Sequence, residues 1–146
     1  MLVDGYNVIF AWDSLRELAE QNIDAARDRL MDILVNYSSY QKHTLILVFD
    51  AYKLKGHTTE IMEYHNIYVV YTKEAETADR YIEKTAHEIG HKYRVTVVTS
   101  DGMEQVIIRS AGCILMSSKE LFEDVQRVER EIPVSYTHLT LPTKRI

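Results

Sequence analysis

Three short apolar runs of this chain each end in an aspartate. The runs cover residues 2–4, 45–50 and 95–101, and they end at Asp4, Asp50 and Asp101. Short Val, Ile and Leu runs without polar alternation are typical of strands buried on both faces of a parallel sheet. The carboxyl ends of such strands line the ligand crevice of an open α/β sheet. Three converging carboxylates repel each other unless a cation joins them. The pattern therefore predicts a site for Mg²⁺ or Mn²⁺, which prefer oxygen ligands.

Strand and helix patterns alternate along the rest of the chain. Two further segments, 67–71 and 113–116, have the β-branched and apolar composition of strands. Apolar residues at three- and four-residue spacing predict helices over about 14–41, 75–88, 101–110 and 118–131, the first broken at Asn22 or Asp24. This alternation predicts an α/β fold with right-handed crossovers and a parallel sheet.

Length, charge and cysteine content limit the class of protein. A chain of 146 residues is long enough for one domain with its own core. Its net charge of −5 argues against a protein that coats nucleic acid non-specifically, but not against a nuclease with local basic groups. The lone Cys113 forms no internal disulfide and fits a cytoplasmic location. No apolar run approaches the ~20 residues of a membrane span, so we predict no membrane partner.

The end of the chain differs from the rest. Residues 133–146 contain no acidic residue and resemble translated sequencing-adapter text, whereas the preceding segment is rich in acids. We therefore expect a single domain over residues 1–132 that the native protein continues differently, and a non-native tail over 133–146.

The first aspartate opens the sequence Asp4-Gly5-Tyr6-Asn7. Gly5 allows a sharp turn after the strand, and Asn7 then lies close enough to bond the Asp4 carboxylate, a metal-bound water or a phosphate. The alternative is an ordinary Asp-Gly turn in which Asn7 caps a helix.

Acidic residues also crowd the start of the helix predicted over 75–88. On a helical wheel Asp79 flanks the buried face, whereas Glu76 points further out, so Asp79 is the better ligand and Glu76 a second choice. Alternatively, Asp79 and Glu76 could serve only to interact favourably with the dipole of the helix. Asp101 likewise has an alternative role as an N-cap with Glu104 at the third helical position.

Basic residues follow the second aspartate. Lys53, Lys55 and His57 come directly after Asp50, and we expect the two lysines to hold the phosphates of a substrate. Tyr52 could stack on a base or pack on the domain.

One motif points to different chemistry. His87, Glu88 and His91 match the H-E-x-x-H pattern of zinc metalloproteases. The helical wheel places both histidines opposite the buried face, and Gly90 tends to end the helix before His91. The pattern therefore indicates a solvated helix end.

Four motifs together resemble the YacP-like NYN family of the PIN-like nuclease superfamily. They are Leu2-Val3-Asp4-Gly5-Tyr6-Asn7, Val48-Phe49-Asp50-Ala51, Thr72-Lys73-Glu74-Ala75-Glu76-Thr77-Ala78-Asp79 and Val98-Thr99-Ser100-Asp101. The resemblance covers about residues 2–132 and implies a three-layer α/β/α fold with strand order 3-2-1-4-5. It also implies metal-dependent endoribonuclease activity, on mRNA in the context of the ribosome for some members. By motif position the acidic site would comprise Asp4, Asp50, Asp79 and Asp101, with Asn7 accessory and Glu76 less central. The longer C-terminal helical region of the family is missing here.

The resulting hypothesis is an endoribonuclease that uses Mg²⁺ or Mn²⁺ and hydrolyses RNA phosphodiester bonds. The main alternative is a non-catalytic RNA- or ribosome-binding module with a vestigial acidic site. A haloacid-dehalogenase-type phosphatase is disfavoured because its Asp-x-Asp pair is replaced here by Asp4-Gly5-Tyr6.

Overall fold

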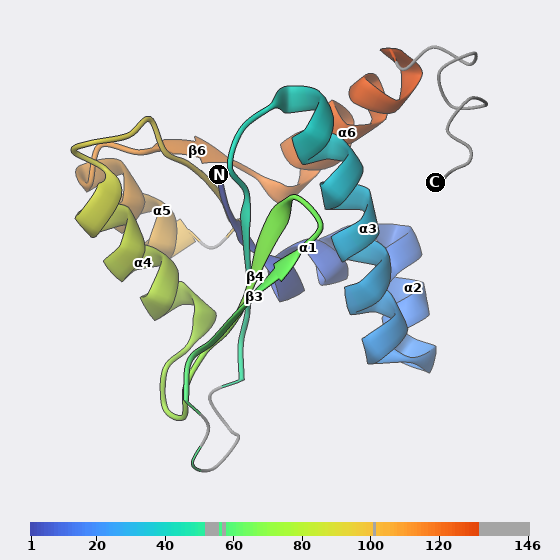
Figure 1. Cartoon of the computed structure of the whole chain (residues 1–146), viewed down its shortest axis with the longest axis horizontal. Helices are drawn as coiled ribbons and strands as arrows, with labels where there is room; N and C mark the ends of the chain where they lie inside the picture. Colours follow the sequence, from blue (N-terminus) through green and yellow to red (C-terminus); the bar gives the residue numbers. More distant parts are fainter. Residues whose placement is uncertain (52–55, 57, 101, 132–146) are drawn as a thin grey trace.

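The computed structural model describes residues 1–51, 56, 58–100 and 102–131, which alternate between strands and helices (Figure 1). The strands are β1 (Leu2–Asp4), β2 (Ile46–Phe49), β3 (Glu60–Tyr64), β4 (Ile67–Tyr71), β5 (Thr96–Val98) and β6 (Ile114–Met116). The helices are α1 (Gly5–Ala11), α2 (Asp13–Gln21), α3 (Ile23–Gln41), α4 (Ala78–Ile89), α5 (Gly102–Ser110) and α6 (Ser118–Glu131).

The described strands form one six-stranded sheet in the order β3-β4-β2-β1-β5-β6. All neighbouring pairs are parallel except β3 and β4. The five parallel strands therefore follow the expected order 3-2-1-4-5, and the α/β class is confirmed. The order differs in one detail, because an antiparallel strand that the sequence did not predict forms one edge of the sheet.

The unpredicted strand β3 is defined by pairing rather than by burial. Residues 60–63 are all exposed, so the segment lacks the apolar alternation that marks a half-buried strand. It forms because a tight turn with a left-handed His65, at φ 54°, folds it back onto β4.

The central strands are buried on both faces. Successive residues of a strand point to opposite sides of the sheet, and here both sides are covered. One core contains the strand residues Val3, Leu47, Phe49, Val69 and Val98. The other contains Leu2, Val48, Val70 and Val97.

Helices form a layer on each side of this sheet. α1, α2, α3 and α6 pack on the first core, and α4 and α5 on the second, on opposite sides of the strands in Figure 1. The predicted three-layer arrangement is thus confirmed.

The strand order reverses direction at β1. β2 lies on one side of β1 and β5 on the other, and the crossovers to them run on opposite faces of the sheet. Ligands of open α/β sheets bind at such switch points, outside the carboxyl ends of the strands.

A polar cap divides the helix that was expected over about 14–41. The predicted break is found at Asn22, whose side chain accepts a hydrogen bond from the backbone N–H of Ala25 at 3.1 Å and so starts α3. The chain also forms a helix, α1, where a turn was expected after Asp4.

Gly5 is required by packing rather than by a turn. It is the first residue of α1, and an added Cβ would lie 2.4 Å from Cε1 of Phe49. Since Phe49 is fully buried, its ring has no free space to move into.

We expect Gly5→Ala to destabilise the protein by about 1–3 kcal/mol through this overpacking, although alanine is the better helix former. The melting temperature should fall by roughly 5 °C. Gly102→Ala is the matched control, since an added Cβ there meets nothing within 4 Å. Equal melting temperatures for the two variants would contradict the packing argument.

Residues 132–146 lie outside the described residues, so the expected domain boundary at residue 132 stays a prediction. Within the part of the chain that is described, no helix has both the length and the apolar character needed to cross a membrane.

Candidate active site

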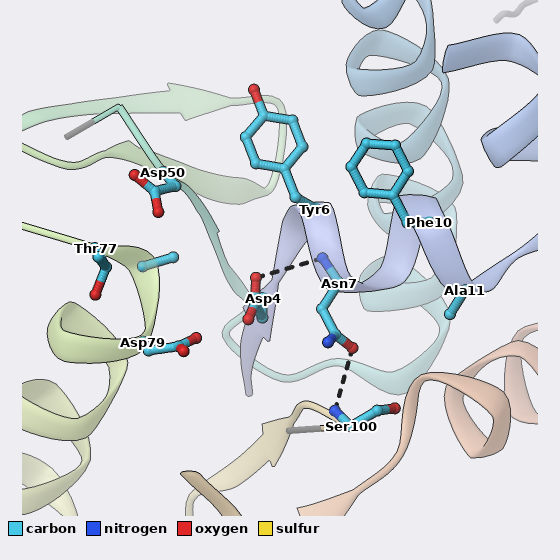
Figure 2. Close-up of a pocket in the computed structure, with 10 residues that line it drawn as sticks. Asp4, Tyr6, Asn7, Phe10, Ala11, Asp50, Thr77, Asp79 and Ser100 are labelled. Atoms are coloured by element: carbon cyan, nitrogen blue, oxygen red, sulfur yellow. Dashed lines mark hydrogen bonds between the residues drawn. The ribbon is translucent and has the colours of Figure 1, made fainter. Parts of the chain in front are cut away.

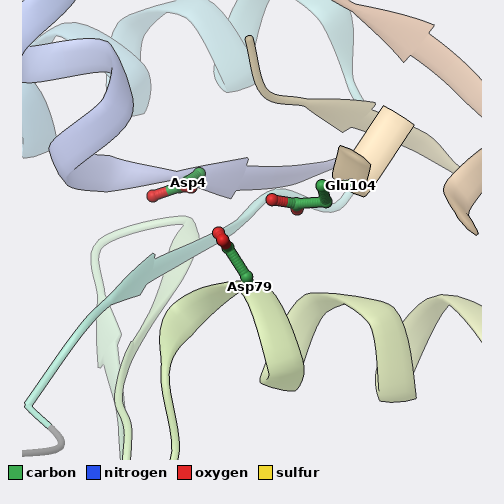
Figure 3. Close-up of side chains that lie close together, drawn as sticks. All are labelled: Asp4, Asp79 and Glu104. Atoms are coloured by element: carbon green, nitrogen blue, oxygen red, sulfur yellow. The ribbon is translucent and has the colours of Figure 1, made fainter. Parts of the chain in front are cut away.

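Three carboxylates meet at the switch point of the sheet. One oxygen from each of Asp4, Asp79 and Glu104 lies within 4.8 Å of the other two (Figure 3). Asp4 ends β1, Asp79 lies in the first turn of α4, and Glu104 lies in the first turn of α5. We call these three residues the carboxylate cluster.

Local capping orients the first two members. The Asp4 side chain caps α1 by accepting the backbone N–H of Asn7 at 3.5 Å. The Thr77 hydroxyl caps α4 by accepting the backbone N–H of Arg80 at 3.2 Å. Asp79 is the second residue of this helix. Each carboxylate is therefore held by the start of a helix, where the dipole favours negative charge.

Glu104 is the most deeply buried member, at 3% exposure. The hydroxyl of Thr99, which follows β5, donates to Oε2 of Glu104 at 3.3 Å. The side-chain amide of Gln105 in turn donates to the Thr99 carbonyl at 3.2 Å. The end of β5 and the first turn of α5 are thus tied together beneath the cluster.

Burial and mutual repulsion disfavour the charged forms of the cluster. Burial raises the pKa of Asp4 to about 7, and Asp79 adds to this through a hydrogen bond and its negative charge. Burial raises the pKa of Glu104 to about 9, again with contributions from Asp79 and then Asp4. Two carboxyl groups hydrogen-bond only if one holds a proton, so the cluster without a cation retains protons near neutral pH.

This chemistry fits a hard divalent cation. The cluster offers several oxygen donors around one point, and burial together with the neighbouring carboxylates raises the pKa values of Asp4 and Glu104. Mg²⁺ and Mn²⁺ take such carboxylate ligands and would replace the shared protons.

An open pocket of about 550 Å³ lies in front of the cluster (Figure 2). Its lining includes Asp4, Tyr6, Asn7, Phe10, Ala11, Asp50, Thr77, Ala78, Asp79 and Ser100. Asp50 follows β2, and its charge also raises the pKa of Asp4. The pocket thus receives side chains from the ends of β1, β2 and β5 and from the start of α4.

Asn7 connects three elements at the edge of this pocket. Its Oδ1 accepts the backbone N–H of Ser100 at 3.1 Å and the hydroxyl of Ser118 at 2.6 Å. Its own N–H meets Asp4. Because the amide oxygen is bonded to the loop after β5 and to the start of α6, Asn7 is placed to position these segments around the cluster.

The structure brings together several of the residues that the sequence singled out. Asp4 and Asp79 lie in the cluster, while Asp50 and Asn7 line the same pocket. Asp101, Lys53 and Lys55 lie outside the described residues, as do the other basic and aromatic candidates of that loop, His57 and Tyr52.

Glu76, the second-choice ligand, is directed elsewhere. Its Oε2 pairs with Nζ of Lys84, which lies eight residues further along the chain in α4, at 3.0 Å. Among the described residues it is not a member of the carboxylate cluster.

Glu104 is the site residue that sequence reasoning missed. It was considered only as a partner for an N-cap at Asp101. Its position one helical turn after the third aspartate run was the available clue, because that turn must start at the same edge of the sheet as Asp4.

The H-E-x-x-H motif does not form a metal site in the structure. His87 and His91 are both exposed, and α4 ends at Ile89 before the second histidine. The expected solvated helix end is therefore confirmed.

Comparison with known proteins identifies related sequences and structures. The family model for the YacP-like NYN domain matches residues 1–144. The uncharacterized protein YacP of Bacillus subtilis (strain 168) is 40% identical over 133 residues, which cover 90% of this chain and 78% of that protein.

Two crystal structures of Rae1 (YacP) from Bacillus subtilis share the fold. One matches with a TM-score of 0.77 and 37% identity over 97% of this chain and 81% of its own. The other, a mutant, matches with a TM-score of 0.76 and 38% identity over 88% of this chain and 75% of its own.

Proposed function

The chain belongs to the YacP-like NYN domain family, a family of PIN-like nuclease domains, and on that premise we propose that it is a metal-dependent endoribonuclease. The proposed reaction is hydrolysis of internal phosphodiester bonds of RNA. The proposed cofactor is Mg²⁺ or Mn²⁺.

The carboxylate cluster is the observation that supports this proposal. Asp4, Asp79 and Glu104 would hold the cation, with Asp50 in the lining of the adjoining pocket. Asp101 remains a proposed further ligand from its sequence position alone. Buried carboxyl groups with raised pKa values, here Asp4 and Glu104, are a recurrent feature of catalytic sites when they lie at a switch point.

The chain itself would contribute charge, position and access. A bound divalent cation supplies a more acidic water and stabilises negative charge that develops on the phosphate. Asp4 and Glu104, whose raised pKa values favour their protonated forms, would hold the cation as carboxylates and would release their protons to do so. Asn7 keeps the loop at Ser100 in place beside them. The pocket is open to solvent and would admit a polymer strand.

We further propose how the substrate is held and where it is met. Lys53 and Lys55 would contact the phosphates that flank the scissile bond. Messenger RNA on the ribosome is the proposed substrate context, with the ribosome as a partner and the cytoplasm as the location. The net charge of −5 makes such a partner useful, because the chain has little general affinity for RNA.

The proposal predicts internal cleavage of a labelled single-stranded RNA by the purified protein when Mg²⁺ or Mn²⁺ is added, and none when the cation is chelated. Ribosome-bound mRNA serves as a second substrate. If neither RNA is cut and neither cation changes the melting temperature, the acidic site is not functional, and the protein is better described as a non-catalytic RNA- or ribosome-binding module.

A further inference from the structure

An exposed aromatic ring lines the carboxylate pocket. Phe10 is 53% exposed, yet it lies on α1 in the wall of the pocket that contains Asp4 and Asp79 (Figure 2). Val8 and Ile9 of the same helix are fully buried in the core. α1 therefore presents its polar and aromatic face to the pocket, and Phe10 contributes apolar surface there that the core does not use.

A second ring stands beside Phe10 and is held in place. The rings of Tyr6 and Phe10 are stacked with centroids 6.3 Å apart. Tyr6 also packs on Phe49 with ring centroids 5.1 Å apart, and its hydroxyl accepts a hydrogen bond from Nη1 of Arg27 at 2.9 Å. We call Tyr6 and Phe10 the aromatic wall. The anchoring of Tyr6 makes the wall a preorganised surface.

The aromatic wall and Asp4 are offset along α1 within the same pocket. Phe10 follows Asp4 by six positions, so their backbone positions differ by roughly 9 Å along the helix axis at 1.5 Å per residue. This span is comparable with the size of one nucleotide. The pocket volume of about 550 Å³ leaves space for a base and its sugar beside the ring.

We propose that the aromatic wall is a base-binding subsite in which an unpaired nucleobase of single-stranded RNA stacks on the exposed face of Phe10. This inference rests on the proposed function, because the carboxylate cluster determines where the neighbouring phosphodiester lies. Base stacking is sequence-tolerant, since every base has a π-face. Bases of a duplex are already stacked on both faces, so the subsite selects single strands.

The experiment measures RNA binding without divalent cation, so that no strand is cut. A short fluorescent RNA is compared with the same strand carrying one abasic position, using the wild type, Phe10→Ala and the control Tyr93→Ala. Tyr93 is 66% exposed and precedes β5, so it lies near the amino end of that strand, whereas the pocket lies at the carboxyl ends of the strands. We expect Phe10→Ala to weaken binding of the intact RNA by about 5- to 100-fold, and Tyr93→Ala to leave it unchanged.

A set of strands, each with the abasic site at a different position, measures the energetic coupling between one base and Phe10. At the position that meets Phe10, removal of the base should cost the wild type the same factor and cost Phe10→Ala nothing more. Phe10→Trp should restore binding, and its added fluorescence should be quenched by the intact RNA. A merely structural role of Phe10 would produce neither the coupling nor the quenching.

The possible outcomes separate this inference from the proposed function. Binding that depends on Phe10, without any cleavage in Mg²⁺ or Mn²⁺, supports the base-binding subsite and contradicts the proposed nuclease activity. Cleavage by the wild type with equal affinity of Phe10→Ala for intact and abasic RNA overturns the subsite and leaves the nuclease. Failure of the wild type to bind the single strand also overturns the subsite.

Discussion

Asp79→Asn is expected to reduce metal-dependent RNA cleavage by at least about 100-fold, because changes to residues that merely support a metal site already cost about 10–100-fold. Asp79 is the central member of the carboxylate cluster, since its hydrogen bonds and charge act on both Asp4 and Glu104. Asparagine keeps the shape and one oxygen but removes the charge that the cation needs.

The same change should not unfold the protein. Asp79 raises the pKa values of both neighbours, so its neutralisation removes repulsion from a buried cluster. The cation-free variant should therefore melt at least as high as the wild type near pH 8. Removing an active-site charge commonly increases stability while it reduces activity.

Glu88→Gln is the matched control for charge removal from the same helix. Glu88 is exposed near the end of α4 and lies outside the pocket lining. The Glu88→Gln variant should cleave RNA at the wild-type rate. Cleavage by Asp79→Asn at more than about a tenth of the wild-type rate would exclude the proposed role of the cluster.

The second large effect is a loss of thermal stability of the cation-free protein as the pH rises from about 4 to about 9. The folded-state pKa of Asp4 is raised from 3.8 to about 7, and that of Glu104 from 4.5 to about 9. Between each pair of values the folded state binds more protons than the unfolded state. The protons on Asp4 and Glu104 therefore stabilise the folded state fully below the unfolded-state pKa, and this stabilisation is lost as the pH rises through the folded-state pKa.

Divalent cation should reverse this loss, because it takes the place of the protons. At a concentration about 100 times Kd, the gain is roughly 3 kcal/mol, or roughly 10 °C in melting temperature. The measurement is a thermal melt at several pH values, with chelator or with Mn²⁺.

Glu104→Gln provides the diagnostic variant for this second prediction. Without cation it should be more stable than the wild type above pH 7 and less dependent on pH, and it should gain less from Mn²⁺. A wild-type melting temperature that stays constant over this pH range, with no response to Mn²⁺ or Mg²⁺, would be incompatible with a buried, cation-binding cluster.

The sequence predicted the frame of the molecule well, because local patterns carry that information. Runs without alternation identified strands covered on both faces. The helix predicted over 118–131 is α6, and Ser117 and Glu120 form a capping box with two hydrogen bonds at its start. The edge strand β3 was missed because its residues are exposed and only pairing with β4 makes it a strand. α1 was missed because it has only seven residues and follows the first strand directly.

Site prediction had a similar limit. Asp4, Asp50 and Asp79 were predicted from strand ends and a helical wheel, and all three line the pocket. The wheel also ranked Asp79 above Glu76, whose carboxylate pairs with Lys84. Glu104 and Phe10 gave no such indication, since a glutamate in a first turn and an apolar residue in a helix are both ordinary.

By itself, therefore, the sequence determined that strands and helices alternate, that acidic side chains end the parallel strands, and that the four motifs are those of a YacP-like NYN domain. These are properties of neighbouring residues, and periodicity and spacing express them directly. Only the tertiary structure decided that Glu104 completes the cluster and that Phe10 stays exposed beside it. Both depend on how α1 and α5 are set against the sheet at its switch point, which no local pattern specifies.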